Sequence, residues 1–441
     1  MIRKLTYAAI FLAAFATFLS RAHRSGTMND PPRGGDARDY EAIAFNLWKA
    51  RGFGYYWSDA EWQEPYRRSP RFRAALGRES EYYPTTYRPP ALPALLALVY
   101  SVAGRNFAAW VVLNCAFVAG AVTLGAAIAV HFGGLLAAPV AAFLILQSPE
   151  LSDLSREVMT EGLAAFLVSL LAWLWVTGGR KPVSNRMAAV SGVVLGALVL
   201  ARSIFVLWLP IALFTPGRDE SSGGDPDASG FRARWGGRKL WLARAVCVVA
   251  AVLVVGPWWV RNIVVTRAFL PMGSQGPINL PAGFSQRALD NQGRWRSNAG
   301  DGARELIAEG VSPLSLEYEV RLAKVRSATT LKWMREHPLD VLRLMRMHVW
   351  QELRPRRGTT AWNLLLPAAV AALLYFRKTP GVTVVGLILC ANIFSIAMTW
   401  GATGRFMVPV QPLLLALVSA MAISIVREAG GWLRRPGRQA A

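Results

Sequence analysis

Long, nearly charge-free apolar blocks constrain this chain more than any other feature of its sequence. A run of about 20 apolar residues crosses a hydrocarbon core about 30 Å thick as a helix, which satisfies its own backbone hydrogen bonds there. The sequence therefore predicts an all-α polytopic membrane protein with about 10 to 11 transmembrane or half-spanning helices. The apolar blocks lie near residues 5–21, 89–104, 107–128, 134–148, 160–177, 188–216, 241–262, 360–376, 380–399 and 404–426.

Composition agrees with membrane insertion. The chain of 441 residues is 53% hydrophobic and 17% charged, yet it carries 49 Lys and Arg against 27 Asp and Glu. These basic residues lie in loops beside the apolar blocks, where they orient spans and contact anionic lipid headgroups, so nucleic-acid binding is not expected. The three cysteines all fall inside apolar blocks, which favours small buried residues over disulfides or metal ligands.

The distribution of basic residues predicts the orientation. Short loops rich in Lys and Arg remain cytoplasmic in bacterial inner-membrane proteins, which places both termini inside. The polar stretches 22–88 and 263–358 are then extracytoplasmic loops, and the Gly/Ser/Asp-rich stretch 217–240 is a cytoplasmic linker. The first apolar block resembles a signal peptide but lacks a convincing cleavage site, so we expect an uncleaved span. The basic loops contain Arg3 and Lys4; Arg180, Lys181 and Arg186; Arg232, Arg234, Arg238 and Lys239; Arg377 and Lys378; and Arg427, Arg434, Arg435 and Arg438.

Two parts of the chain need a further assumption. If blocks 89–104, 107–128 and 134–148 all crossed the membrane, residues 149–159 would lie on the cytoplasmic side. Block 134–148 has only 15 residues, so we interpret it as re-entrant or half-spanning. Block 188–216 holds Arg202 and is expected to form two short helices. The resulting organisation is a membrane module at 1–262, an extracytoplasmic region at 263–358, and C-terminal helices with a basic tail at 359–441.

Two aspartates lie where the first polar stretch becomes helical. Asp36 and Asp39 precede an apolar pattern at helical spacing, which indicates an amphipathic helix on the membrane surface. A carboxylate at this boundary would act as a general base toward an acceptor hydroxyl or hold a divalent metal ion. The alternative is that Asp36 only caps the helix N-terminus. The apolar pattern consists of Tyr40, Ile43, Ala44, Leu47 and Trp48.

Further charged residues lie at the predicted outer ends of spans. Arg88 precedes Pro89 and Pro90 at a membrane entry, where it would bind a lipid phosphate or extend to the headgroups. Glu157 and Glu161 are one helical turn apart at the start of another span, and carboxylates entering a membrane helix are usually functional.

Two more arginines complete this set. Arg261 and Asn262 follow a pair of tryptophans, which also fits an aromatic belt, and Arg405 lies in a tight turn between two spans. The predicted topology brings Asp36, Arg88, Glu161, Arg261 and Arg405 to one depth on one face, although they come from five distant segments.

In these segments the chain resembles the GT-C superfamily, specifically bacterial relatives of protein O-mannosyltransferases and of the lipid A aminoarabinose transferase. Five stretches carry the resemblance, in order: DARDYEAIAFNL, YRPPALPALLAL, SREVMTEGLAAFL, GPWWVRN with GPINLPAG, and GRFMVPVQP. Two departures are Phe406, where relatives commonly carry Tyr, and the missing adjacent Asp-Glu pair at Asp36. The second departure leaves a protein acceptor without support.

The resemblance implies roles for these residues. Asp36 matches the catalytic aspartate, because Tyr40 follows at the family's spacing and is expected to bind substrate. Arg88 matches the residue that contacts the carrier phosphate. Glu161 matches a second acidic position beside the acceptor or a metal, so Asp36 and Glu161 are the expected catalytic pair. The other expected substrate-binding residues are Glu157, Arg261, Asn262 and Arg405.

The predicted function follows from this set of residues. The sequence predicts a membrane glycosyltransferase that takes a sugar from a polyprenyl-phosphate-linked donor and gives it to a lipid, polysaccharide or protein of the cell envelope. A flippase or transporter is an alternative, but its charges usually lie near the membrane midplane. An O-antigen ligase or polymerase is another, but it is expected to carry its main polar loop late in the chain.

Overall fold

The computed structural model describes residues 1–68, 80–178, 184–214, 238–296, 302–353 and 360–433. Most of the predicted linker at 217–240 lies outside these ranges. The described chain is almost wholly helical, as predicted, and its strands β1 (Gly54–Tyr55) and β2 (Tyr83–Pro84) form a small antiparallel pair in which Gly54 faces Pro84.

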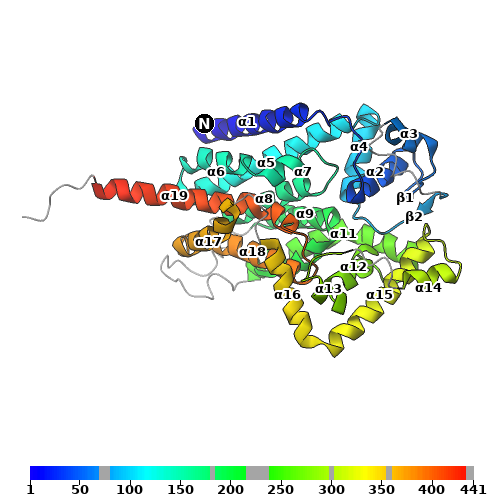
Figure 1. The fold of residues 1–441 in the computed structure, drawn as a ribbon. Helices are drawn as coiled ribbons and strands as arrows, with labels where there is room; N and C mark the ends of the chain where they lie inside the picture. The colour runs from blue at the N-terminus through cyan, green and yellow to red at the C-terminus, as the bar shows by residue number, and fades with distance from the viewer. Residues whose placement is uncertain (69–79, 179–183, 215–237, 297–301, 354–359, 434–441) are drawn as a thin grey trace, which may run out of the picture.

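The described ranges contain eleven apolar helices, of which 5 have the length and composition to span a bilayer unaided. Figure 1 shows the N-terminus and the far end of α19 at the same end of this bundle. This arrangement is that of a polytopic membrane protein. The long helices are α1 (Ile2–Arg24), α5 (Phe107–Gly133), α8 (Glu161–Gly178), α11 (Arg238–Thr266) and η3 (Arg405–Val410) continuing into α19 (Gln411–Leu433); the shorter ones are α4 (Ala91–Ala103), α6 (Ala137–Leu146), α9 (Asn185–Ala201), η2 (Ser203–Phe214), α17 (Thr360–Tyr375) and α18 (Val382–Ala397).

Small residues allow the bundle helices to approach closely. A Cβ atom at Gly192 of α9 would lie 2.1 Å from the Cys247 carbonyl oxygen of α11, and one at Gly196 would lie 2.9 Å from the Ala251 carbonyl oxygen. Glycines spaced by four residues form this kind of contact in membranes, where dispersion between backbones replaces the hydrophobic effect as the source of association. This packing holds α9 in place, and its last turn leads directly to Arg202.

The interpretation of 134–148 as re-entrant or half-spanning stays a prediction, and α4 is a second short apolar helix, held beside the first polar stretch. Contacts at both ends of α4 join it to α2 (Gly35–Trp48): Arg88 binds Asp36 and Asp39, and Arg105 binds Glu41. Helix α4 has 13 residues and α6 has 10, so both are shorter than a full span.

Helix α6 lies beside α19, with contacts near both of its ends. Arg427, late in α19, donates to the Gly133 carbonyl just before α6, whereas Ser148, just after α6, donates to Gln411 at the start of α19. Val158 packs in one cluster with Ala37 and Tyr40 of α2, so this part of 149–159 lies at the same end as α2.

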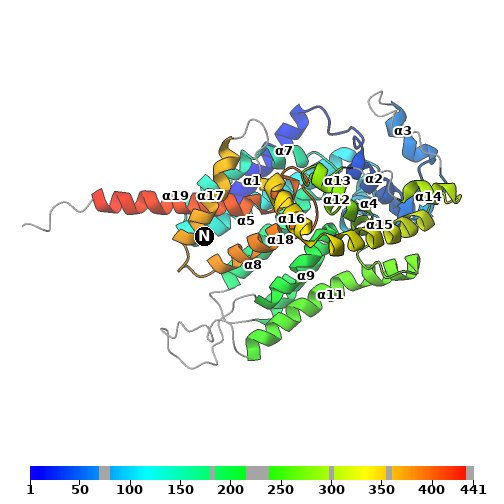
Figure 2. The ribbon, with the colours of Figure 1, turned by 60° about the horizontal axis from the view of Figure 1, so that its bottom comes forward.

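The two long polar stretches lie together at one end of the bundle. Figure 2 shows α2 and α3 (Ala60–Arg68) of the first stretch beside the helices of the second. Arg261 donates to the carbonyls of Phe53 and Thr85, and Glu319 accepts from Thr85 and Thr86. The sequence predicts this shared side, but the outward orientation of that end stays a prediction. The second stretch contains α12 (Gln275–Gly283), α13 (Gln286–Asp290), α14 (Ala303–Ala308), α15 (Leu316–Glu336) and α16 (Pro338–Leu353), and α7 (Pro149–Leu154) is at the same end.

Candidate active site

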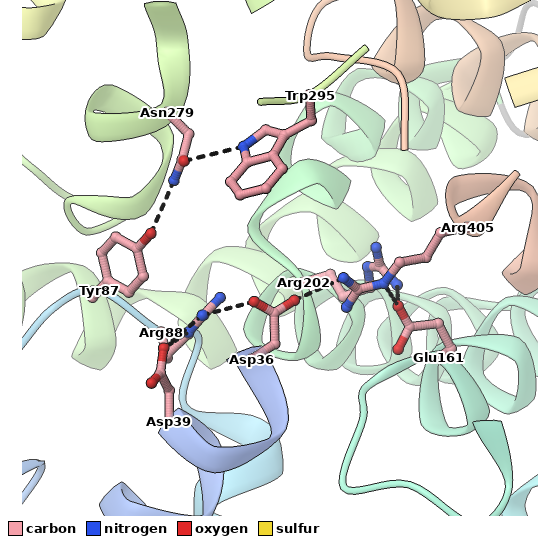
Figure 3. A network of polar contacts seen from close by, with 9 residues as sticks. All are labelled: Asp36, Asp39, Tyr87, Arg88, Glu161, Arg202, Asn279, Trp295 and Arg405. Atoms are coloured by element: carbon pink, nitrogen blue, oxygen red, sulfur yellow. Dashed lines mark hydrogen bonds and ion pairs between the residues drawn. The ribbon is translucent and has the colours of Figure 1, made fainter. Parts of the chain in front are cut away.

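A chain of alternating carboxylates and arginines lies where the two polar stretches meet the bundle (Figure 3). Arg88 Nη2 lies 2.6 Å from Asp39 Oδ2 and 2.7 Å from Asp36 Oδ1. Arg405 Nη1 lies 2.7 Å from Asp36 Oδ2, and its Nε donates to Glu161. Arg202 Nη1 lies 2.7 Å from the same Glu161 oxygen. Three acids and three arginines from five segments thus form one connected, electrically balanced network.

The helix start at Gly34 and Gly35 places Asp36 in this network. Gly34 is the N-cap residue of α2 and has a φ of 132°, a conformation that residues with a Cβ rarely adopt. The interpretation of Asp36 as the N-cap is therefore wrong. Its carboxylate lies in the first turn, where the positive end of the helix dipole favours negative charge, and each of its oxygens binds one arginine.

These contacts determine the acidity of Asp36. Burial alone would raise the pKa of its carboxyl, but the charges and hydrogen bonds of Arg88 and Arg405 outweigh burial and lower the pKa to about 2. The side chains of Asp36 and Arg405 are 28% and 29% exposed. Asp36 is thus ionised near neutral pH and accessible, but it is a weak base as long as both arginines bind it.

Glu161 occupies a different position from that expected of a catalytic residue. Its side chain is fully buried and its Oε1 accepts from both Arg202 and Arg405. A carboxylate without exposed surface does not contact an acceptor, and this position fits a residue that orients two guanidinium groups. Arg202, which the candidate set from the sequence omits, joins the site because α9 ends there and η2 begins at Ser203.

A cavity of about 600 Å³ opens beside this network. Asp36, Arg88, Arg202 and Arg405 line one side of it, together with Tyr40, whose ring lies 5.4 Å from the Arg88 guanidinium carbon. The Phe406 ring lies 5.3 Å from the Arg202 guanidinium carbon. It stands at the position where the resemblance implies a Tyr hydroxyl in relatives. These three arginines on one side of the cavity present guanidinium donors of the kind that bind a phosphate group.

The remaining walls differ in polarity. One is apolar and contains Ile204, Val206, Leu207, Met272 and Pro89. The opposite wall is polar and aromatic, and comes mainly from the second polar stretch and the turn before Arg405. It contains Tyr87, Gln275, Gly276, Asn279, Arg294, Trp295, Thr399, Trp400, Gly401, Ala402 and Thr403.

Three predicted substrate-binding residues do not line the cavity. Arg261 Nη1 donates to the Thr85 carbonyl at 2.6 Å and its Nη2 to the Phe53 carbonyl at 3.1 Å. Asn262 is fully buried and donates to the Pro271 carbonyl. The backbone carbonyl of Glu157 accepts from Trp110 and Asn114. These contacts give Arg261 a role in holding the loop that leads to Arg88, and Asn262 a role in holding the segment that follows α11.

Two buried glutamates of the second polar stretch hold the backbone beside the site arginines. Glu319 accepts from Thr85, Thr86 and Ser274 at 2.6 to 2.8 Å, next to Arg88. Glu352 accepts from the backbone N–H groups of Ala402 and Phe406, on either side of Arg405. Burial raises the pKa of Glu352, although these backbone donors act in the opposite direction. Neither glutamate has a signal in the sequence, because each lies in an ordinary amphipathic helix.

The arrangement does not fit a metal ion at Asp36 and Glu161. Both carboxylates are bound by Arg405, and the arginines balance the negative charge that would attract a cation. In the described ranges no group of three or more His, Cys, Asp or Glu side chains is placed to hold a metal.

Comparison with solved structures defines the fold. No protein-family model and no curated protein sequence matches the chain. The oligosaccharyltransferase AglB from Archaeoglobus fulgidus, in complex with an inhibitory peptide and a dolichol-phosphate, has a TM-score of 0.52 and 14% identity over 100% of this chain and 53% of its own. The same enzyme tethered with an acceptor peptide has a TM-score of 0.53 and 14% identity over 98% of this chain and 51% of its own.

A second enzyme is more distant. ArnT from Cupriavidus metallidurans, bound to undecaprenyl phosphate, has a TM-score of 0.41 and 12% identity over 96% of this chain and 79% of its own. AglB and ArnT are GT-C glycosyltransferases. The similarity to AglB shows that this chain has the GT-C fold, as the resemblance in its sequence predicts, and the chain spans about half the length of AglB.

Proposed function

We propose that the protein is a membrane glycosyltransferase that moves a sugar from a polyprenyl-phosphate carrier to an acceptor of the cell envelope, at the outer face of the bacterial cytoplasmic membrane. The observation that carries this proposal is the cavity with three arginines on one side and an apolar wall. Arg88, Arg202 and Arg405 suit the phosphate, and the apolar wall suits the first isoprene units. That AglB has been solved with a dolichol-phosphate supports the same class of ligand.

The network suggests how donor binding prepares Asp36. A phosphodiester that binds Arg88 and Arg405 competes for the guanidinium groups that lower the pKa of Asp36 to about 2. Loss of those hydrogen bonds and the new negative charge both raise the pKa of this carboxylate, which makes it a better base. The base thus gains strength only when a donor is in place.

The transfer step is balanced in atoms and charge. The acceptor hydroxyl gives its proton to Asp36 while its oxygen bonds to the anomeric carbon, and the bond from that carbon to the phosphate oxygen breaks. The carrier leaves with the electron pair as a phosphate monoester bearing one more negative charge. The arginines stabilise this charge where it develops, and Asp36 has lost an equal charge by protonation. Attack from the face opposite to the leaving phosphate would invert the anomeric configuration.

Turnover of a labelled donor tests the proposal. Purified protein in vesicles would be mixed with undecaprenyl phosphate esterified to labelled glucose or mannose and with a cell-envelope fraction as acceptor. We expect release of undecaprenyl phosphate and transfer of label, both dependent on Asp36. If the protein neither binds nor turns over any of these carriers, the proposed function is wrong.

A further inference from the structure

The wall opposite the arginines contains an aromatic and amide cluster without a role in the proposed phosphate chemistry. Asn279 of α12 donates from Nδ2 to the Tyr87 hydroxyl at 3.1 Å, and Trp295 Nε1 donates to Asn279 Oδ1 at 3.3 Å (Figure 3). All three residues line the cavity. The Trp295 side chain is 47% exposed, although it is a large indole held by two sets of hydrogen bonds.

Backbone contacts fix the position of Trp295. Its N–H donates to the Gly401 carbonyl at 2.9 Å, and the Gly401 N–H donates to the Gly293 carbonyl at 2.9 Å. Gly401 belongs to the turn that carries Arg405, and Tyr87 directly precedes Arg88. The cluster is therefore attached at both ends to segments that carry phosphate-binding arginines, so a group bonded to that phosphate lies within its reach.

We propose that Trp295, oriented by Asn279 and Tyr87, forms the subsite for the sugar ring of the donor. A pyranose has an apolar face of C–H groups, which packs on an aromatic ring, and a rim of hydroxyls that need polar partners. Asn279 already donates to the Tyr87 oxygen, so that hydroxyl keeps its own proton for a sugar oxygen. The Arg294 side chain, which donates from Nε to Gln351 Oε1 at 3.1 Å, also lines this part of the cavity.

The subsite differs from the remaining part of the cavity in what it recognises. The arginines would bind the bare carrier phosphate and the sugar-bearing carrier alike, whereas Trp295 would contribute only when a sugar is attached. This inference rests on the proposed function, and the difference between the two carriers separates the two claims.

Binding of two carriers to variants of Trp295 tests the inference. Protein in nanodiscs would be titrated with undecaprenyl phosphate and with undecaprenyl phosphate esterified to glucose or mannose, with bound carrier counted by native mass spectrometry. We expect Trp295→Ala to weaken binding of the better sugar-bearing carrier roughly tenfold, the scale of one aromatic contact, and to change binding of the bare carrier less than about twofold. Trp295→Phe keeps an aromatic face and should recover most of the loss.

Trp350→Ala is the matched control, because Trp350 belongs to the same polar stretch, is 63% exposed and does not line the cavity. It should leave both affinities unchanged. Equal effects of Trp295→Ala on the two carriers, or a wild-type protein that gains nothing from either attached sugar, would overturn the sugar subsite while leaving the phosphate site intact. Wild-type protein that binds no carrier at all would overturn both.

Discussion

The two polar stretches at this end of the bundle use their carboxylates in different ways. In residues 22–88, Asp36 and Asp39 bind Arg88 directly, and Asp36 reaches a cavity. In residues 263–358, Glu319 and Glu352 accept hydrogen bonds from hydroxyl and backbone N–H groups. The first stretch thus carries charge that a ligand can redistribute, whereas the second holds the segments that carry that charge.

The largest effect is expected from replacing Asp36. Asp36→Asn removes a charge and a base while keeping the shape of the side chain, so we expect the rate of sugar transfer to fall by a factor on the order of 100 to 10,000. Initial rates in vesicles measure it. Asp153→Asn, at an exposed position at the same end of the bundle, is the control and should stay near the parent rate. An Asp36→Asn rate within about threefold of the parent, well short of the loss of a base, would move the base elsewhere.

The sequence alone predicts the same phosphate-binding role for Arg88 and Arg261, but in the structure only Arg88 of the two lines the cavity. Arg88→Ala should weaken binding of undecaprenyl phosphate by about 2 to 5 kcal/mol, because it also removes the ion-pair partner of Asp39 and leaves Asp36 paired with Arg405 alone. Arg261→Ala removes hydrogen bonds to two backbone carbonyls, so it should lower thermal stability and change carrier affinity little. Equal losses of affinity in the two variants would mean that Arg261 also contacts the carrier.

Replacing Glu319 and Glu352 tests whether the second polar stretch holds the segments that carry the charged residues. Glu319→Gln and Glu352→Gln each present an amide N–H₂ group to donors that need an acceptor, so each should lower the free energy of unfolding by about 1 to 3 kcal/mol. Thermal unfolding in detergent measures this change. Because each glutamate acts through the backbone beside an arginine, the loss of activity should be regained when the variant is assayed at lower temperature. A variant of normal stability with lost activity would place that glutamate in the chemistry.

How far the sequence predicts the site depends on how each residue is held. Asp36, Arg88, Glu161 and Arg405 come together as expected, because topology alone brings the ends of spans to one level. Arg202 could have been included, since an arginine inside a long apolar block is expensive unless paired. The partners of Arg261 are the backbone carbonyls of Phe53 and Thr85, whose positions hydropathy does not encode.

The same limit applies to the fold. The apolar blocks predict the helical bundle, but α4 and α6 both fall below spanning length, so length alone could not distinguish which one crosses. The ion pairs at the two ends of α4 join it to α2, and they depend on how α2 packs, which hydropathy does not encode. The roles of Glu319 and Glu352 cannot be predicted from the sequence for a related reason: their partners are hydroxyl and backbone N–H groups, which occur throughout the chain.

The smallest expected effect concerns pH. The pKa of Asp36 is lowered from 3.8 to about 2, so its ion pairs stabilise the fold fully above the ordinary pKa and lose this effect as the pH falls toward about 2. The difference in unfolding temperature between the parent and Asp36→Asn should therefore be constant from about pH 8 to pH 5 and should shrink below about pH 4. A difference that already shrinks near pH 6 would mean that the arginines do not bind Asp36 in the free protein.

The balance of charges in the network has a consequence for how a substrate finds the site. Three arginines that face three carboxylates within hydrogen-bond distance leave almost no net field beyond a Debye length of about 8 Å at physiological ionic strength. The excess of +22 charges over the whole chain instead attracts the anionic membrane surface. Added salt should therefore weaken the binding of acidic lipids at concentrations that still leave carrier binding unchanged. The carrier reaches the cavity by diffusion in the plane of the bilayer.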